Sequence, residues 1–183
     1  MRRIERSERR PIVDFRASPV SIRRATIDDR AGVTQVLKAS YPVLMKQAYD
    51  KEVLARALPV MTVSQPALLN SGTYYVAETS DGTIVGCGGW SKERPGSNEV
   101  RPRLGHVRHF GVHPNWTRQG IGLSIYHSCV EDAKAAGINR LECYSSLNGE
   151  PFYQALGFKS LETIDLPMSE GVHLPSIRMV AKI

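Results

Sequence analysis

The chain has 183 residues, of which 42% are hydrophobic and 23% charged, with 15 glycines and 11 prolines. This composition excludes fibrous and disordered proteins and predicts one globular domain that needs no disulfide or metal ion to be stable. The three cysteines are far apart and form no CxxC pair, so neither a disulfide framework nor a zinc knuckle is indicated. No apolar run reaches the roughly 20 residues that a membrane-spanning helix needs, and the charged N-terminus lacks the apolar stretch of a signal peptide. We therefore expect a cytoplasmic protein that does not contact a membrane.

The formal net charge is +6, from 24 Lys and Arg against 18 Asp and Glu. Half of it lies in residues 1–16, where six arginines face three acidic residues. A short, mixed-charge terminus of this kind is typically poorly ordered, so we expect residues 1–19 to be a flexible Arg-rich leader and residues 20–183 to form a single domain. The rest of the chain is only mildly basic and aromatic residues make up 7% of it, which argues against nucleic acid as the partner.

The first predicted elements are a strand and a helix. Residues 20–24 alternate between apolar and polar side chains, as a half-buried strand does. Thr26 is followed three residues later by Asp29, which is a capping signal, so a helix is expected to begin there. Tyr41 precedes Pro42, and because proline disfavours helix in the residue before it, this helix is expected to end near Ser40.

A short second helix is expected at about residues 53–58, with Pro59 and Pro66 interrupting the segment that follows. Two β-rich runs, residues 73–78 and 84–90, flank an Asp-Gly pair, which is a strong signal for a β-hairpin. The elements expected after the hairpin are an exposed loop at 93–103, a strand at 104–113, a helix at 120–136, a strand at 141–145, a short helix at 150–156 and strands at 158–166 and 176–181. This order predicts a mixed α/β or α+β sheet with helices packed on its faces.

The most informative segment lies between the strand at 104–113 and the helix at 120–136. Gly120 and Gly122 fall in the first turn of that helix, where backbone N–H groups have no partner and the helix dipole is positive. Glycines there let an anion approach the main chain, and Arg118 adds a cation able to bind a phosphate. The GxxxxGK[ST] loop is absent, and GxGxxG fails because position 125 is isoleucine, so ATP and NAD are not indicated.

Residues 117–122, Thr-Arg-Gln-Gly-Ile-Gly, resemble the Gln/Arg-x-x-Gly-x-Gly/Ala signature of the GCN5-related N-acetyltransferase (GNAT) superfamily, with threonine in the first position. Residues 148–158 resemble the Asn…Phe-Tyr-x-x-x-Gly-Phe segment of the same family. The resemblance covers roughly residues 20–183. It implies a central twisted mixed sheet of about seven strands with helices on both faces.

The resemblance also implies acetyl-CoA as co-substrate, with its diphosphate on the glycine loop and its pantetheine arm on the backbone of the preceding strand. Tyr153 resembles the general acid of the family, although a packing ring is the alternative interpretation. For Asn148, the alternative to a cofactor contact is a role as a helix cap. The residues that the resemblance assigns to cofactor binding are Phe110, Gly111, Val112, Arg118, Gln119, Gly120, Ile121, Gly122, Leu123 and Asn148.

Three histidines lie in or next to the strand at 104–113. Strand alternation would place His106 on one face with Arg108, Phe110 and Val112, and the other two histidines on the opposite face. No metal site is therefore expected. His106 occupies the position at which several family members have a glutamate base, and its ordinary pKa near 6.5 suits that work. A structural or solvated histidine remains the alternative.

We therefore expect an N-acetyltransferase that transfers the acetyl group of acetyl-CoA directly to a primary amine of a small molecule or peptide. His106 would be the base, Tyr153 the acid and the N–H of Val112 the oxyanion donor; the cysteines are not needed as nucleophiles. The resemblance places the acceptor pocket at about residues 33–69 and 167–175. The alternatives are a non-catalytic acyl-CoA sensor and, last, a basic nucleic-acid-binding protein. A homodimer is compatible with the sequence.

Overall fold

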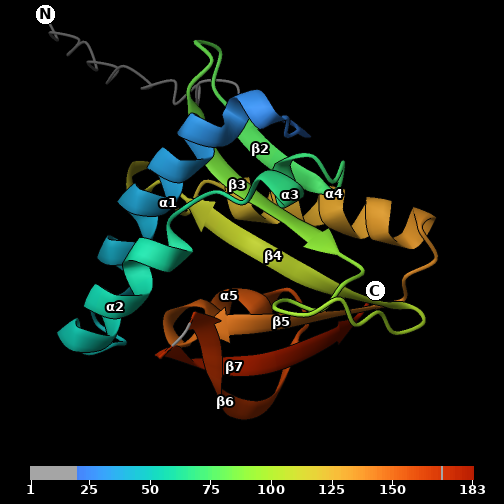
Figure 1. The fold of residues 1–183 in the computed structure, drawn as a ribbon. Helices are drawn as coiled ribbons and strands as arrows, with labels where there is room; N and C mark the ends of the chain where they lie inside the picture. Colours follow the sequence, from blue (N-terminus) through green and yellow to red (C-terminus); the bar gives the residue numbers. More distant parts are fainter. Residues whose placement is uncertain (1–19, 170) are drawn as a thin grey trace, which may run out of the picture.

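The computed structural model describes residues 20–169 and 171–183, so the expectation for the leader at 1–19 lies outside the described residues. The chain forms one seven-stranded sheet in the order β1-β2-β3-β4-β5-β7-β6 (Figure 1). β4 and β5 are parallel and the other neighbouring strands are antiparallel. The strands are β1 Ser21–Arg24, β2 Tyr74–Glu78, β3 Ile84–Ser91, β4 Leu104–Val112, β5 Arg140–Ser146, β6 Lys159–Ser169 and β7 Val172–Lys182.

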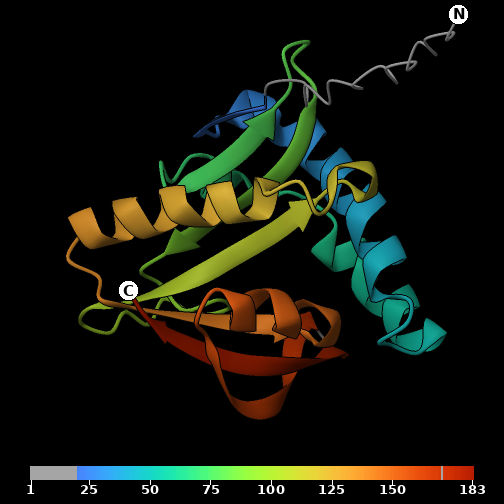
Figure 2. The same ribbon diagram turned by 180° about the vertical axis from the view of Figure 1, so that it is seen from behind.

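Helices cover both faces of this sheet, which confirms the predicted mixed α/β architecture. α1 and α2 lie on one face, and α4 and α5 on the other (Figures 1 and 2). The helices are α1 Arg30–Met45, α2 Lys51–Met61, α3 Pro66–Leu69, α4 Ile121–Ala135 and α5 Glu150–Ala155, with 3₁₀ turns at Ile27–Asp29, Pro114–Trp116 and Leu147–Gly149. The helix predicted at 120–136 therefore agrees with α4 to within a residue at each end.

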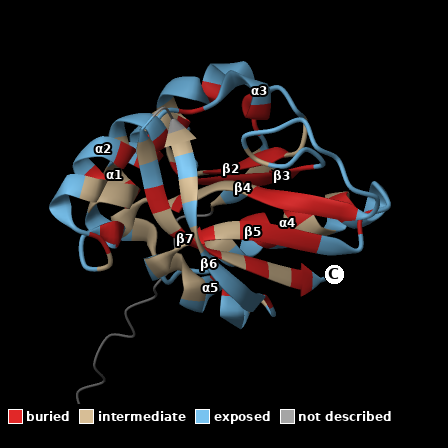
Figure 3. Ribbon diagram, turned by 60° about the horizontal axis from the view of Figure 1, so that its bottom comes forward, coloured by how far each residue is buried: buried red, intermediate tan, exposed pale blue. Residues whose placement is uncertain are grey.

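The core has one cluster on each face of the sheet and a third beside them. Figure 3 marks the buried residues in red, and many of them lie on the strands of the sheet. Ile125 of α4 is fully buried in the cluster on the α4 face. Leu37 of α1 is fully buried in the cluster on the α1 face. The third cluster joins α1 and α2 to β7 through Met45, Met61 and Leu174. Side chains from α1 thus reach both the sheet and α2.

Two prolines do not end helices as the sequence predicts. α1 continues through Pro42 to Met45, and α2 continues through Pro59. A proline inside a helix costs about 3 kcal/mol, but burying a large apolar side chain contributes a comparable ~1.5–3 kcal/mol. Met45, one turn after Pro42, is buried in the third cluster and supports the longer helix. Pro66 begins α3, a position that tolerates proline because its N–H would have no partner there.

The last hairpin is longer than predicted. Residues 167–175, expected to form a loop, lie mostly in β6, which runs to Ser169, and in β7, which begins at Val172. The pairing continues through Leu166 with Leu174 and Pro167 with His173. Proline is tolerated at Pro167 because β6 is an edge strand of the sheet.

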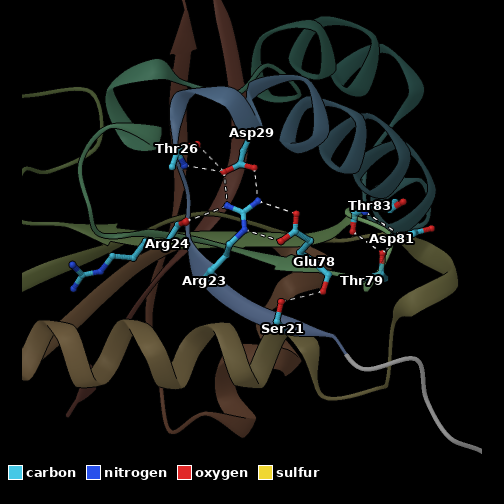
Figure 4. A network of polar contacts seen from close by, with 9 residues as sticks. All are labelled: Ser21, Arg23, Arg24, Thr26, Asp29, Glu78, Thr79, Asp81 and Thr83. Atoms are coloured by element: carbon cyan, nitrogen blue, oxygen red, sulfur yellow. Dashed lines mark hydrogen bonds and ion pairs between the residues drawn. The ribbon is translucent and has the colours of Figure 1, made fainter.

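A network of charges ties the start of the domain together (Figure 4). The Arg23 guanidinium donates two 2.8 Å hydrogen bonds to the Asp29 carboxylate, and it also binds Glu78 of β2. The backbone N–H of Thr26 donates to the same Asp29 side chain, completing the predicted capping box. The hydrogen bonds from Arg23 hold the pKa of Asp29 below its ordinary value of 3.8. β1, the first helical turn and β2 are thereby fixed to one another.

Replacing Asp29 with asparagine leaves the partly buried Arg23 without one of its two carboxylates. At pH 7 the free energy of unfolding should fall by about 2 kcal/mol, measured by denaturant unfolding. Because the folded-state pKa of Asp29 is lowered, its stabilisation is complete above 3.8 and is lost as the pH falls through the lowered value. The difference between wild type and Asp29→Asn should therefore shrink below pH 3.8. The exposed neighbour Asp28 is the control, and equal losses in Asp28→Asn would contradict this account.

Candidate functional site

The sheet opens between β4 and β5. The two strands pair only from Leu104 to His106 on β4 and from Arg140 to Glu142 on β5. Beyond that point they spread apart towards their C-terminal ends (Figures 1 and 2). A cleft of about 1010 Å³ lies there, lined by residues of both strands, of α1, α2, α4 and α5, and of the β6–β7 hairpin. It is the place where a ligand can reach unpaired strand backbone.

A β-bulge in β4 changes which side chains face the cleft. Gly111 is opposite Cys87 but Arg108 is opposite Gly89, so two residues, His109 and Phe110, are opposite Gly88. His109 has a φ of 48°, a strained value for a residue with a side chain. The predicted alternation is therefore wrong.

The clusters in the core show the effect of the extra residue. Val107, Phe110 and Val112 all pack in the cluster on the α4 face. Because the bulge inserts one residue, the side chains before it and those after it no longer alternate in one register. His106 and Arg108 consequently do not share a face with Phe110 and Val112.

The bulge also decides where the backbone of β4 points. His113 donates its N–H to the carbonyl of Val85, and Val112 is opposite Gly86. In an antiparallel ladder this makes Val112 and Gly86 a non-hydrogen-bonded pair, so the N–H of Val112 points away from β3 and into the gap. Gly111, by the same alternation, directs its polar groups to β3.

Tyrosine hydroxyls hold the two carbonyls of the bulge. Tyr41 of α1 donates to the carbonyl of Phe110 at 3.0 Å, and Tyr74 of β2 donates to that of His109 at 2.8 Å. Burial raises the pKa of both tyrosines, so both hydroxyls keep their protons at neutral pH. The strained turn of the strand is thereby stabilised from the α1 side.

The N-terminus of α4 opens onto the same cleft. Gly120 precedes the helix with a left-handed φ of 80°, and its carbonyl accepts the N–H of Ser124 at 2.9 Å. The N–H groups before Ser124 have no partner within the helix. Arg118 has a φ of 62° and also lines the cleft. Of the predicted cofactor residues, the lining includes Phe110, Gly111, Val112, Arg118, Gly120, Ile121, Gly122, Leu123 and Asn148.

Gln119 is the predicted cofactor residue that does not line the cleft. Its side-chain amide donates to the carbonyl of Asn115 at 3.3 Å, within the loop. In this structure Gln119 braces the turn that precedes α4.

Tyr153 of α5 lies at the centre of an aromatic group in the cleft wall. Its ring centroid is 5.1 Å from Phe152, 5.4 Å from Phe158 and 6.4 Å from Phe110. The residue is 9% exposed and lines the cleft. Burial raises the pKa of its hydroxyl well above 10, so the phenol is protonated at neutral pH. It can therefore donate a proton to a group inside the cleft.

His106 lies outside the lining of the cleft. It is 3% exposed and lines a small polar pocket, where its Nδ1 is 3.7 Å from Oε1 of Glu142. Burial lowers the pKa of His106 below 6.5, although Glu142 opposes this shift, so the imidazole is neutral at pH 7. Tyr144 lines both the small pocket and the cleft. The structure thus places His106 in the small pocket and Tyr153 in the cleft, and Tyr144 lines both.

The three thiols and His109 are uncharged at neutral pH, although Cys143 and His109 line the cleft. All three cysteines are buried, and burial raises the pKa of Cys87 to about 12 and those of Cys129 and Cys143 still further. Burial lowers the pKa of His109 to about 4. Within residues 20–169 and 171–183, no three His, Cys, Asp or Glu residues are grouped as a metal site requires. The same part of the chain contains no helix long and apolar enough to cross a membrane.

Residues 34–158 match the model of the acetyltransferase (GNAT) family, which is more than half of the chain. The chain belongs to this family. It is accordingly an acyltransferase, as the sequence predicts. No curated protein is similar enough in sequence to match it.

Solved structures share the GNAT fold. The PaiA N-acetyltransferase of Thermoplasma acidophilum, solved in complex with coenzyme A, is 20% identical with a TM-score of 0.67, covering 90% of this chain and 99% of that one. A GCN5-related N-acetyltransferase of Rhodopseudomonas palustris is 20% identical with a TM-score of 0.69, covering 89% and 95%. The N-acetylglutamate synthase of Neisseria gonorrhoeae, complexed with coenzyme A and L-arginine, is 19% identical with a TM-score of 0.60, covering 90% and 33%. At these identities the likeness establishes the fold.

The two segments expected to form the acceptor pocket, 33–69 and 167–175, do contribute to the cleft lining, although sequence reasoning singled out no residue in them. Tyr41, Met45 and Met61 approach the cleft from α1 and α2. Arg108 of β4 lies outside those segments and was not expected in the cleft. The apolar residues carry no signal beyond ordinary helix periodicity. Arg108 does carry one, because it is the one Arg, Lys, Asp or Glu residue in a strand whose other residues are apolar, glycine or histidine.

Proposed function

We propose that the protein transfers the acetyl group of acetyl-CoA directly to a primary amine. The observation that carries this proposal is that three features open onto one cleft: the unpaired edge of β4, the N-terminus of α4 and the protonated phenol of Tyr153. Two of the GNAT structures with the same fold were solved with coenzyme A bound, which supports the choice of donor.

The donor would lie along the gap between β4 and β5. Its pyrophosphate would bind at the N-terminus of α4, where free N–H groups and the helix dipole favour an anion, with Arg118 as a further cation. Its pantetheine arm would extend past the N–H of Val112, and Asn148 would contact it from the β5 side. Phe152 supplies an apolar wall beside the thioester.

The reaction would proceed by direct attack of the neutral amine on the thioester carbonyl. A C–N bond forms, and the N–H of Val112 stabilises the oxyanion of the tetrahedral intermediate. The C–S bond then breaks, and Tyr153 protonates the departing thiolate. The attacking nitrogen then gives one proton to the Tyr153 phenolate, so the phenol is restored and the products are an amide and free CoA. Because burial keeps the three thiols protonated, an acetyl-cysteine intermediate is not part of this proposal.

His106 is the base in this proposal, acting through water. An aliphatic amine has a pKa near 10 and must lose a proton before it can attack. A water next to Tyr144 would carry that proton to the imidazole, which is neutral at pH 7. Glu142, 3.7 Å away, would stabilise the imidazolium that forms.

The binding half of the proposal is tested with two glycines at opposite ends of α4. Gly120 and Gly137 have φ values of 80° and 81°, and an added Cβ would meet no atom within 4 Å at either position. Alanine at either should cost about 1–2 kcal/mol of stability from left-handed strain. Only Gly120 lines the cleft. CoA affinity, measured by calorimetry, should therefore fall roughly tenfold in Gly120→Ala and stay unchanged in Gly137→Ala. Equal affinities would remove α4 from the binding site.

The acid is tested by Tyr153→Phe in an assay of free CoA release with acetyl-CoA and a panel of amines. The variant keeps the packed ring and loses the proton donor, so kcat should fall about 100-fold while CoA affinity is retained. Tyr126→Phe is the matched control, since Tyr126 is also buried beside Phe158 but does not line the cleft. Full turnover in Tyr153→Phe would rule out this acid, and no turnover of any amine by wild type would rule out the activity.

The base is tested by the pH profile of His106→Gln. Because the pKa of His106 is lowered, wild type should hold its activity down to pH 6.5 and lose it as the pH falls further and the imidazole becomes protonated. The variant should be about tenfold slower and should lack this limb of the profile. His173→Gln, at an exposed histidine paired with Asp165, should keep the wild-type profile. An unchanged profile in His106→Gln would assign the base elsewhere.

A further inference from the structure

Arg108 lies in the part of the cleft that faces away from α4. Gln65, to which it donates a hydrogen bond, lines the cleft with it, and Met45 and Met61 line the same cleft from α1 and α2. None of the residues proposed to hold the donor is among them. This half of the cleft is the space left for the amine acceptor.

The guanidinium of Arg108 is held in place by neutral groups. It donates to the hydroxyl of Ser91 at 2.8 Å and to the side-chain carbonyl of Gln65 at 3.4 Å. Two of its five N–H groups are thereby used, which leaves three for a ligand. Burial lowers the pKa of Arg108 below its ordinary value, with Glu93 opposing that shift from a distance. An anion bound there would neutralise the charge of Arg108, whose two hydrogen-bond acceptors in the protein are neutral.

Five other arginines of the described chain, Arg23, Arg24, Arg94, Arg101 and Arg178, have carboxylate partners. Arg23 binds Asp29 and Glu78, and Arg178 lies 3.0 Å from Glu162. Across residues 20–169 and 171–183, no carboxylate lies within 4 Å of Arg108. The described lining of the cleft also contains no Asp or Glu, although it contains Arg108 and Arg118. A polyamine or another polycation would find no countercharge in this cleft.

We infer that Arg108 recognises a carboxylate on the acceptor, so that the substrate is an amine that also carries an acid group. This inference rests on the proposed acetylation of an amine and narrows its substrate class. A guanidinium can bind a carboxylate with two parallel hydrogen bonds, which fixes orientation as well as affinity. With the carboxylate held at Arg108, the amine end is directed towards the thioester, and the methionines of α1 and α2 give an apolar surface to the rest of the acceptor.

The test compares acceptors with and without the acid group. The pairs are 3-aminopropanoate with propylamine, 4-aminobutanoate with butylamine, and L-methionine with L-methioninamide, each assayed by CoA release. Wild type should prefer the acid in at least one pair by about tenfold to a hundredfold in kcat/KM. In Arg108→Gln that preference should fall to within about threefold, through a raised KM for the acid. The KM for acetyl-CoA should not change.

The controls separate recognition from structural support. Arg140→Gln removes the same charge from an exposed residue outside the cleft and should keep the wild-type preference. Arg108→Lys keeps the charge but not the planar fork, and should give an intermediate preference. A thermal melt of each variant shows whether it is folded. If Arg108 only braced Ser91 and Gln65, Arg108→Gln would weaken acid and neutral acceptors equally, which would overturn the inference.

The remaining outcomes are also decisive. A wild-type enzyme that acetylates neutral amines as well as acids would overturn the carboxylate inference but leave the proposed function standing. A wild-type enzyme that acetylates no amine at all would overturn the proposed function. A preference for 3-aminopropylphosphonate over 3-aminopropanoate and 4-aminobutanoate would assign Arg108 to a phosphate group and overturn the assignment to carboxylate.

Discussion

The ladder between β4 and β5 stops after three residue pairs, and the organisation of the site depends on that interruption. Parallel neighbours normally exchange hydrogen bonds along their shared length. Here the bulge at His109 turns β4 aside, so two edges inside the sheet remain without partners. Buried backbone groups without partners are unfavourable. The hydroxyls of Tyr41 and Tyr74 satisfy the two carbonyls of the bulge, and the unpaired edge of β4 opens onto the cleft. The fold gives up sheet stability at one place and gains a binding surface there.

The charges around the cleft are distributed unevenly along its length. Arg118 and the α4 N-terminus form one positive region and Arg108 another, while the described lining contributes no carboxylate. Between them lie the apolar walls formed by Phe110 and Phe152. Acetyl transfer needs a neutral amine and an uncharged thioester to meet, and a surrounding of low polarity does not disfavour either. In the proposed reaction, charge would therefore orient the two reactants from their far ends, while their reacting ends would meet among aromatic rings.

Sequence patterns predict the local features well and the non-local ones poorly. The cap at Thr26, the hairpin turn at Gly82 and the period of α4 each depend on residues close in the chain, and the structure has all three. The passage of α1 through Pro42 depends on packing against α2 and β7, which no local pattern contains. The bulge at His109 depends on the register between β3 and β4, which no local pattern contains. The predicted alternation along β4 is wrong for the same reason. Arg108 had a local signal, because it is the one permanently charged residue of β4, but only its position in the cleft gives that signal a functional interpretation.

The burial of Cys87, Cys129 and Cys143 has a practical consequence. A thiol reacts with disulfide reagents as its thiolate, and none of these three side chains offers one to solvent in the folded state. A chromogenic reagent added to the native protein should consequently report only thiols supplied by the reaction mixture. The same reagent also detects unfolding, because three thiols per chain should react once the domain unfolds.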